Sequence, residues 1–560
     1  MFFVYKFCCI CLFHFCFIIS GFQFSAFAQN DSSVFDKLKK EGRYLPDFSF
    51  AGYHNGEKEL PGIEGTVVFA KDYGVMANDG IDDSKALIKA MEESYKIEGH
   101  VVLMLPPGRI ILSEILYIER SNFVLRGAGT GMKGTEIYFP RPLMYVEDPE
   151  QLRELREYLI EFKKRQKEPE NNIDLPFSQY AWSGGFIWTK VPDVRVKSYL
   201  QNYEKPYEVL ANVVNGKRGE FELTVKNIKD LSVGDVVELQ WFNKDGENAD
   251  IIDEIYQNAE IRIGSHHWNF PDLPLVKQQV EITKVSKNSI TIKSPLTIDV
   301  QSKYNAQLVK WEHLREVGIE HLKMSFPNYP RVAHHVEPGF NAIYLTRVFN
   351  GWVNNVVIEN ADSGVLTEEI ANVTIKNVTT KGDNMAHYTV AMSGTYNVLA
   401  EGIKVYNRAV HPLSFNTFST KSVYLDCEVF VDPILDQHSG ANHQNLFDNI
   451  TVHLSPLQDS SYPLFVGGGA PYWKPSHGAF STFWNIEVNL TSALDSKKSI
   501  LLNGMEDGPF ARVIGVHGNH HFEVDYGPDA FIDRTNESLR SITSLYEYQL
   551  ERRLDKEQNN

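Results

Sequence analysis

Seven short segments of similar composition recur in the second half of this sequence. Each combines a turn-forming residue, usually asparagine, with alternating apolar side chains, and the central apolar residues are Ile358, Ile375, Ile403, Cys427, Ile450, Ile486 and Ile514. The intervals between them are 17, 28, 24, 23, 36 and 28 residues. Short strands repeated at this period are typical of solenoids, in which each coil buries its apolar face against the next. The pattern therefore predicts a stack of short parallel strands.

The length of the chain supports the same architecture. Of the 560 residues, Met1–Ala28 has the pattern of a signal peptide, which leaves 560 − 28 = 532. A single compact core normally stops growing at about 250–300 residues. A β-sandwich of this length is the alternative, but the hairpin turns that it requires are few here. We therefore expect an all-β chain that forms a parallel β-helix, because the core of a rod grows with the number of coils.

Four motifs near the beginning carry a resemblance to a known superfamily. They are Asp72-Tyr-Gly-Val, Asp79-Gly-Ile-Asp-Asp-Ser, Val101–Pro107 followed by glycine, and Leu125-Arg-Gly-Ala-Gly. Together they resemble the opening of the pectate-lyase-like right-handed parallel β-helix superfamily, of the polysaccharide lyase type. The resemblance implies a right-handed β-helix whose open end is capped by a helix. The superfamily also contains hydrolases, epimerases and non-enzymatic phage fibres, so the resemblance specifies the fold better than the activity.

The chain can be divided by its local patterns into eight parts. We predict a signal peptide (1–28), a loop-dominated N-terminal extension (29–65), first coils with the cap helix (66–146), a charged helical excursion (147–170), a further coil (171–207), a β-rich insertion (208–308), the main coils (309–535) and a C-terminal helix with a tail (536–560). The excursion has leucines at helical spacing, whereas the insertion has strands of alternating hydrophobicity.

Export and charge limit the class of partner. Cleavage of the signal peptide removes four of the five cysteines and leaves Cys427, so no internal disulfide is expected. The chain has 55 basic and 72 acidic residues and a net charge of −17, which argues against nucleic acid as a partner. We expect a periplasmic or secreted monomer without a membrane span, whose partner is an anionic polysaccharide or oligosaccharide.

Three histidines in the repeat region are separated by about one coil each. The intervals between His387, His411 and His438 are 24 and 27 residues. Residues one coil apart stack at about 4.8 Å, so these imidazoles can line one groove. Scaffolding ladders at the coil corners are the structural alternative. The residues expected to surround the groove are Tyr388, Lys381, Asn384, Arg408, Asn416, Gln437, His443 and Trp473.

This set of side chains suits β-elimination from a uronic acid. The reaction needs a base for the C5 proton, an acid for the C4 leaving group and a group that neutralises the carboxylate. We predict His411 or His438 as the base, with His387 close by, and Tyr388 as the acid. Arg408 and Asn416 are predicted to hold the carboxylate, and the remaining residues of the set to bind the sugar. Loss of a sugar from C4 would make the enzyme a lyase, and loss of the hydroxyl a dehydratase.

Other functions remain open at the level of the sequence. A glycoside hydrolase needs two carboxylates, for which Asp383, Asp432 and Asp436 are candidates. A carbohydrate-binding rod without activity would need only stacked aromatic side chains. Calcium is the candidate cofactor, with oxygen ligands from Asp362, Glu368, Glu369 and Asp383, and Asp436, His438 and His443 form an alternative metal site.

Overall fold

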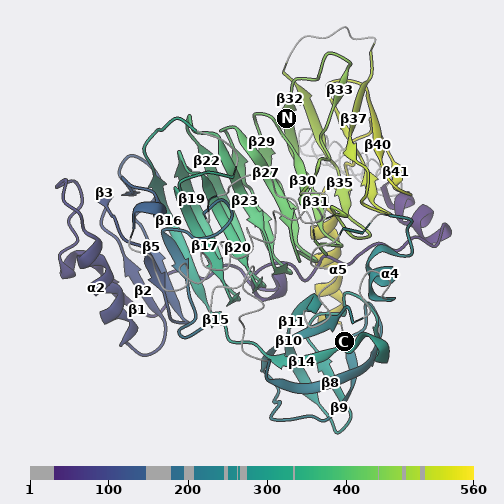
Figure 1. Ribbon diagram of the computed structural model, residues 1–560, viewed down its shortest axis with the longest axis horizontal. Coiled ribbons are helices and arrows are strands. Elements are labelled where there is room, and N and C mark those ends of the chain that lie inside the picture. Colours follow the sequence, from purple (N-terminus) through teal and green to yellow (C-terminus); the bar gives the residue numbers. More distant parts are fainter. Residues whose placement is uncertain are drawn as a thin grey trace, which may run out of the picture.

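The computed structural model describes residues 31–146, 178, 180–194, 207–244, 250–261, 263–264, 274–331, 335–438, 440–469, 474–491 and 498–559. These residues form a rod of stacked parallel strands with a separate antiparallel sheet beside it (Figure 1). The chain is therefore a parallel β-helix, as the repeat predicts. The expected signal peptide, the helical excursion 147–170 and Trp473 lie outside the described residues.

The largest sheet of the rod has two parts. The first part runs along the whole rod and consists of β1 (Thr66–Phe69), β2 (Val101–Met104), β5 (Phe123–Arg126), β16 (Val317–Ser325), β19 (Trp352–Glu359), β22 (Thr374–Lys381), β25 (Leu399–Glu401), β28 (Val423–Leu425), β31 (Leu446–Asp448), β35 (Thr482–Trp484), β38 (Arg512–Ile514) and β41 (Phe531–Asp533). The second part consists of β3 (Gly108–Ile111), β6 (Thr135–Tyr138), β26 (Lys404–Val405), β29 (Glu428–Val429), β32 (Thr451–Leu454), β36 (Glu487–Leu490) and β39 (His517–Gly518). The long strands β16, β19 and β22 pair with members of both parts.

A second sheet completes the coils and carries the side chains of functional interest. Its strands are β4 (Leu116–Ile118), β7 (Ile187–Thr189), β17 (Asn341–Thr346), β20 (Ser363–Glu368), β23 (Ala386–Met392), β27 (Ala409–Asn416), β30 (Leu435–His438) and β34 (Gly467–Gly468). Two smaller parallel sheets line other sides of the rod. They consist of β15 (Leu314–Arg315), β18 (Val348–Phe349), β21 (Ile370–Ala371) and β24 (Thr395–Tyr396), and of β33 (Ser461–Tyr462), β37 (Ile500–Met505) and β40 (Phe522–Tyr526).

The core of the rod is a set of apolar columns. One column follows a single register position through the coils and contains Leu103, Leu125, Ile319, Val353, Ile375, Ala400, Tyr424, Phe447, Phe483 and Val513. All of these side chains are buried in one continuous cluster. Each coil therefore contributes apolar area that only its neighbours can cover, which is the stabilising principle of a solenoid.

The corner between the two parts of the large sheet explains the frequent asparagines. Asn355, Asn377, Asn449 and Asn485 have φ between 52° and 55°, a left-handed conformation that asparagine tolerates. Their amides also bond between coils, since Nδ2 of Asn485 donates to Oδ1 of Asn449 at 2.9 Å. The equivalent position in another coil is Gly402, also with positive φ. The asparagine repeat therefore marks the corners of the coils.

The register corrects one detail of the repeat. Ile358 pairs with Thr380, whereas Ile375 pairs with Val353, so Ile358 and Ile375 do not occupy equivalent positions. The interval of 17 residues between them therefore does not measure one coil. The reason is that each coil contributes more than one apolar strand, and the sequence alone does not show which strands are equivalent.

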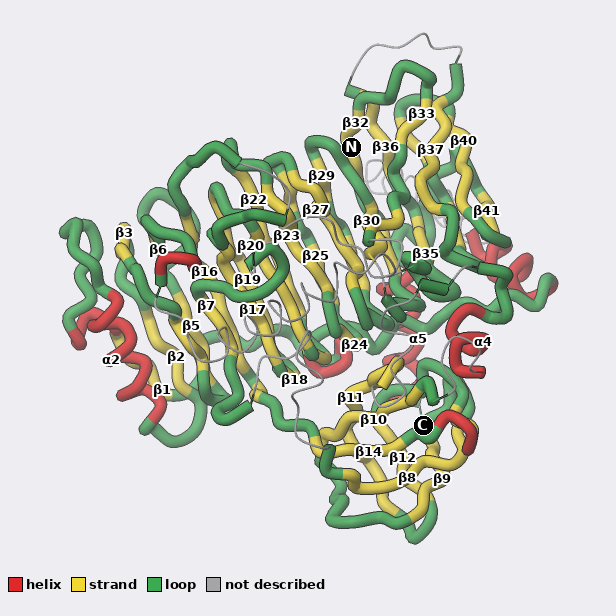
Figure 2. Tube along the Cα trace, viewed as in Figure 1, coloured by secondary structure: helices red, strands yellow, loops and turns green. Residues whose placement is uncertain are grey.

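The insertion is an antiparallel sheet, as the alternating pattern of 208–308 predicts. It consists of β8 (Val209–Gly216), β9 (Glu222–Lys226), β10 (Val236–Phe242), β11 (Pro274–Val285), β12 (Ser289–Ile292), β13 (Val300–Gln301) and β14 (Gln307–Lys310), with the short helix α4 (Asp250–Tyr256) beside it. Figure 2 shows this sheet below the rod. Its own apolar cluster also contains Phe349, Ala371 and Tyr396 of the coils, so it is packed against the rod.

Two helices pack against the rod. Helix α2 (Ser84–Tyr95) lies at the end of the rod formed by the first coils, as the cap was expected to, and Leu87, Ala90 and Met91 face the core (Figure 1). Helix α5 (Leu545–Gln558) packs on the later coils near the C-terminus. Among the described residues, no helix combines the length and hydrophobicity needed to cross a membrane.

The N-terminal segment 31–60, which we call the strap, runs along the outside of the rod. Residues 31–40 are helical, where a loop was expected, and Oδ2 of Asp31 accepts hydrogen bonds from the backbone of Arg540 and Ser541. Further along, Tyr53 belongs to a buried apolar cluster that also contains Val102 of the first coils, and its ring contacts Trp352 edge to face at 5.4 Å. Between these points, strap residues and α5 cover an outward-facing apolar row that contains Leu399, Val423, Leu425, Leu446, Trp484 and Ile514.

A buried carboxylate attaches α5 to the rod and predicts a pH effect. Asp448 is fully buried and accepts hydrogen bonds from Ser544 Oγ, Leu545 N and Tyr546 N at 2.7–3.0 Å. Burial raises the pKa of Asp448 to about 7, although these donors lower it. Because the folded-state pKa lies above the unfolded one, the stability from this group is fully present below about pH 4 and lost as the pH rises through 7.

We expect the contribution of Asp448 to the free energy of unfolding to fall by on the order of 4 kcal/mol as the pH rises from 4 to 8. The measurement is denaturant unfolding of the wild type and Asp448→Asn across that range. The free energy of unfolding of the wild type, relative to that of Asp448→Asn, should fall as the pH rises. A difference that stays constant with pH would contradict the prediction.

Candidate functional site

Strands β23, β27 and β30 are neighbours in the second sheet and bring five polar side chains together. His387 and Tyr388 belong to β23, His411 to β27, and Asp436 and His438 to β30. The strands pair in parallel, so residues far apart in the sequence lie side by side. We call these five residues the His–Tyr cluster. All are buried except His438, whose side chain is 17 % exposed.

The rings of the cluster are in mutual contact. The centroid of the Tyr388 ring lies 4.3 Å from that of His387 and 4.9 Å from that of His411, both in stacked geometry. The His411 and His438 rings meet edge to face at 4.5 Å. The phenol oxygen of Tyr388 accepts a hydrogen bond from Nδ2 of Asn416 at 3.2 Å. Burial, with the charge of Asp436, raises the pKa of Tyr388 above its usual range.

Asp436 is the negative centre of the cluster. Its Oδ2 lies 3.2 Å from Nδ1 of His411 and 3.5 Å from Nδ1 of His438. The hydroxyl of Ser414 donates to the same oxygen at 2.5 Å. Burial alone would raise the pKa of Asp436, but the positive charges of His411 and His438 outweigh it and hold the pKa well below its usual range. One buried carboxylate thus orients two imidazoles.

The cluster does not form in the way that the one-coil spacing suggests. His411 pairs in register with Tyr388, and His438 pairs with Asn416. The three histidines therefore occupy different register positions, and their side chains meet because adjacent strands bring Tyr388, His411 and Asp436 within contact. The three histidines lie on neighbouring strands, and their spacing did not give the alignment of those strands.

A second acidic group adjoins His387 and was not predicted. Glu337 is fully buried, and its Oε1 lies 3.7 Å from Nδ1 of His387. The same oxygen accepts a hydrogen bond from Arg331 at 2.8 Å. His335 contacts the His387 ring at 5.4 Å. These residues come from the loop between β16 and β17, which has no repeat pattern. The histidine doublet at 334–335 was the only signal in the sequence for this loop.

Two of the predicted sugar-binding residues are exposed ion-pairing side chains. Arg408, 64 % exposed, donates to Asp432 at 2.7 Å. Lys381 lies 3.5 Å from a carboxylate oxygen of Glu359.

Three other predicted residues are used inside the structure. Asn384 donates to the carbonyls of Pro327 and Asn360, so it braces a coil corner. Gln437 points into the rod and bonds to the hydroxyl of Tyr526 at 2.9 Å. His443 is buried and contacts the carbonyl of Ala441, and burial lowers its pKa to about 4.

The expected calcium ligands do not gather at one point. Asp362 and Glu368 lie at opposite ends of β20, and Asp362 is bonded to Tyr329 and to the backbone of Gly339 and Phe340. Asp383 accepts a hydrogen bond from Asn328. Among the described residues, the group with metal-binding spacing is His411, Asp436 and His438, in which His411 takes the place expected for His443.

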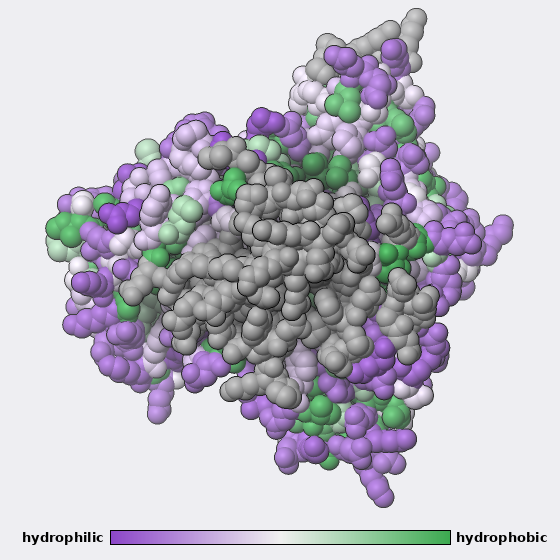
Figure 3. Space-filling view, in the orientation of Figure 1, coloured by the Kyte–Doolittle hydropathy of each residue, from purple (hydrophilic) through white to green (hydrophobic). Residues whose placement is uncertain are grey.

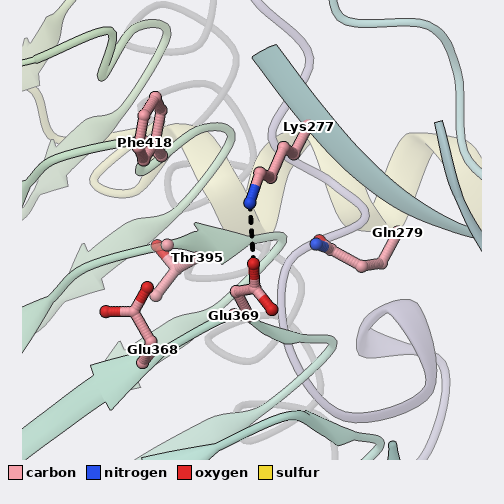
Figure 4. A pocket seen from close by; sticks show the side chains of 7 residues that line it. Lys277, Gln279, Glu368, Glu369, Thr395 and Phe418 are labelled. Carbon is pink, nitrogen blue, oxygen red and sulfur yellow. Dashed lines mark hydrogen bonds and ion pairs between the residues drawn. The ribbon is translucent and has the colours of Figure 1, made fainter. Parts of the chain in front are cut away.

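A small pocket lies where the insertion meets the rod. Figure 4 shows Lys277 of the insertion pointing at Glu369 of the rod, with a distance of 2.7 Å between Nζ and Oε1. Arg347 contacts the other oxygen of Glu369 at 2.9 Å. Burial alone would lower the pKa of Lys277, but the charge of Glu369 outweighs this and raises it. The pocket is lined by Lys277, Gln279, Glu368, Glu369, Gly394, Thr395 and Phe418.

Comparison with known proteins assigns the chain to no family. No family model matches the sequence, and no curated protein matches it. Among solved structures, the chain is similar to the tailspike gp49 from Pseudomonas phage LKA1, with 12% identity, a TM-score of 0.38, and 83% of this chain and 78% of that one covered.

Two further structures give similar values. The Gp54 tailspike of Acinetobacter baumannii bacteriophage AP22, in complex with a capsular saccharide, has 11% identity, a TM-score of 0.40 and coverages of 83% and 65%. The DFA-IIIase from Arthrobacter chlorophenolicus A6, in complex with GF2, has 10% identity, a TM-score of 0.38 and coverages of 84% and 94%.

Proposed function

We propose that this protein is an exported carbohydrate-active enzyme that performs β-elimination on a uronic-acid-containing polysaccharide or oligosaccharide. The observation that carries the proposal is the His–Tyr cluster itself. A fully buried carboxylate, three imidazoles and a phenol meet on adjacent strands, and such a set of proton-transfer groups exceeds what a coil needs for its stability. Coil corners elsewhere use asparagine amides for that purpose.

The proposed reaction needs two proton transfers. A base removes the proton from C5 of the uronate, the electron pair forms the C4–C5 double bond, and the bond from C4 to its oxygen breaks. The leaving oxygen then takes a proton from an acid. If that oxygen belongs to the next sugar, the enzyme is a lyase; if it is the C4 hydroxyl, water is lost and the enzyme is a dehydratase.

We assign the base to His387 and the acid to Tyr388. His387 has its own carboxylate, since Oε1 of Glu337 lies 3.7 Å from its Nδ1. The Tyr388 ring stacks on His387, so the two groups can act on neighbouring atoms of one sugar. This assignment differs from the sequence-based one, which gave the base to His411 or His438. In the structure these two imidazoles face a single shared carboxylate.

The test is incubation of the purified protein with a panel of uronate polysaccharides and their oligomers. Elimination produces a conjugated unsaturated uronate, which is followed by its ultraviolet absorbance and by mass spectrometry of the products. New absorbance with chain cleavage indicates a lyase, and new absorbance with loss of one water indicates a dehydratase. New reducing ends without absorbance would replace the proposal by hydrolysis, and binding without any product would replace it by a carbohydrate-binding rod.

A further inference from the structure

We propose that His411, Asp436 and His438 bind a divalent first-row transition-metal ion, for which Zn²⁺ is the natural probe. Nδ1 of each imidazole and a carboxylate oxygen would be the protein ligands. The three ligand atoms lie within 4.8 Å of one another. Two imidazoles and one carboxylate are a donor set that zinc and its neighbours in the periodic table prefer.

The distances between the ligand atoms fit such an ion. With bonds of about 2.0–2.1 Å, two ligands of a tetrahedral ion lie about 3.3 Å apart. The separations from Oδ2 of Asp436 are 3.2 Å to Nδ1 of His411 and 3.5 Å to Nδ1 of His438. Both values exceed the usual length of a charge-assisted N–H···O hydrogen bond, about 2.7–2.9 Å. An ion held between the three atoms fits these separations.

The surroundings hold the ligands in place. Asp436 and His438 are two residues apart on β30, so their side chains leave the same side of the strand, and His411 comes from the adjacent strand β27. The Ser414 hydroxyl bonds to Oδ2 of Asp436 at 2.5 Å, the kind of outer contact that orients a metal-binding carboxylate. Asp436 is fully buried, and a bound cation would supply the positive charge that the protonated imidazoles otherwise supply.

Gly468 provides space beside His438. It pairs in register with His438 on β34, and a Cβ atom at this position would lie 1.8 Å from Nδ1 of His438. The backbone of β34 therefore reaches the imidazole only because residue 468 has no side chain. Any larger residue would occupy the volume next to the nitrogen that faces Asp436.

The function of the ion rests on the proposed elimination. That reaction requires a positive charge against the substrate carboxylate, so that the C5 proton becomes acidic. Arg408, three residues before His411, is already paired with Asp432, and Arg331 is paired with Glu337, the carboxylate beside His387. The structure therefore assigns the carboxylate-binding charge to the metal site, next to the proton-transfer pair His387 and Tyr388.

The experiment measures metal content directly. The purified full-length protein is stripped with a chelator, reloaded with Zn²⁺ or Co²⁺, freed of excess ion by gel filtration, and analysed by mass spectrometry of the elements and by the visible absorption of bound Co²⁺. We expect about one ion per chain and a Zn²⁺-dependent rise in the melting temperature. His411→Ala and His438→Ala should each lose at least nine-tenths of the bound metal.

The matched control is His453→Ala. His453 also faces a carboxylate, Glu428, at 2.9 Å, but lies outside the cluster, so this variant should keep its metal. Metal retained by both cluster variants, or wild type that releases all of its metal, would overturn the proposal. The two proposals fail in different ways: elimination by metal-free protein overturns the role of the ion and leaves the proposed function standing, whereas bound metal without any elimination product overturns the proposed function alone.

Discussion

Replacement of Tyr388 by phenylalanine is expected to lower kcat by ~10²–10⁴-fold on the substrate that the polysaccharide panel identifies. The substitution removes only the phenol oxygen, so it deletes the proposed acid while the ring contacts with His387 and His411 remain. The one hydrogen bond lost in the described residues is that from Asn416. The melting temperature should therefore change little, and KM much less than kcat.

Tyr406→Phe is the matched control for this variant. Tyr406 stacks on Phe430 at 4.3 Å and is 45 % exposed, so loss of its hydroxyl should leave the rate within about two-fold of wild type. The measurement is the initial rate of absorbance increase for the three proteins at saturating substrate. If Tyr388→Phe keeps the wild-type rate, Tyr388 is not the acid.

Glu369→Gln is expected to reduce the free energy of unfolding by about 3–5 kcal/mol. The substitution leaves the ammonium group of Lys277, 7 % exposed, and the guanidinium group of Arg347, 14 % exposed, without their shared carboxylate. An uncompensated buried charge costs far more than a pair contributes on the surface, because water cannot replace the missing partner. Denaturant unfolding of wild type and variant measures the effect.

The surface provides the comparison for this prediction. Lys310 and Glu312 form an ion pair at 2.6 Å in which both side chains are about half exposed. Glu312→Gln should change the free energy of unfolding by no more than about 1 kcal/mol. Hydrophilic residues dominate the outline of the described surface in Figure 3. Equal effects of the two substitutions would show that burial does not determine the strength of the Lys277–Glu369 pair.

The coil architecture could be predicted because its cause is local. Alternating apolar residues and left-handed corner asparagines such as Asn449 leave a pattern in every coil. Register could not be predicted, since Ile358 and Ile375 look alike in the sequence and only the pairing of β19 with β22 shows that they differ. Loop lengths between strands vary, and this variation removes the information that a strict period would carry.

The site could be predicted only where its residues lie in the repeat. His387, His411 and His438 are on coil strands, so their spacing indicated one region of the rod. Glu337 was missed because it lies in a connecting loop, where no periodicity relates it to His387. Arg408 was expected at the carboxylate because of its charge, but the sequence does not show that Asp432 pairs with it.

The strap has a consequence for how this rod comes apart. In an ordinary solenoid each coil touches only its neighbours, so terminal coils can fray independently. Here Asp31 accepts hydrogen bonds from Arg540 and Ser541, which follow the last coil, and Tyr53 shares a buried cluster with Val102 of the first coils. Unfolding at one end therefore also disturbs the strap that contacts the other end, so the two ends of the rod are coupled. During synthesis, the N-terminal strap cannot form its contacts with Arg540 and Ser541 until these residues have been made.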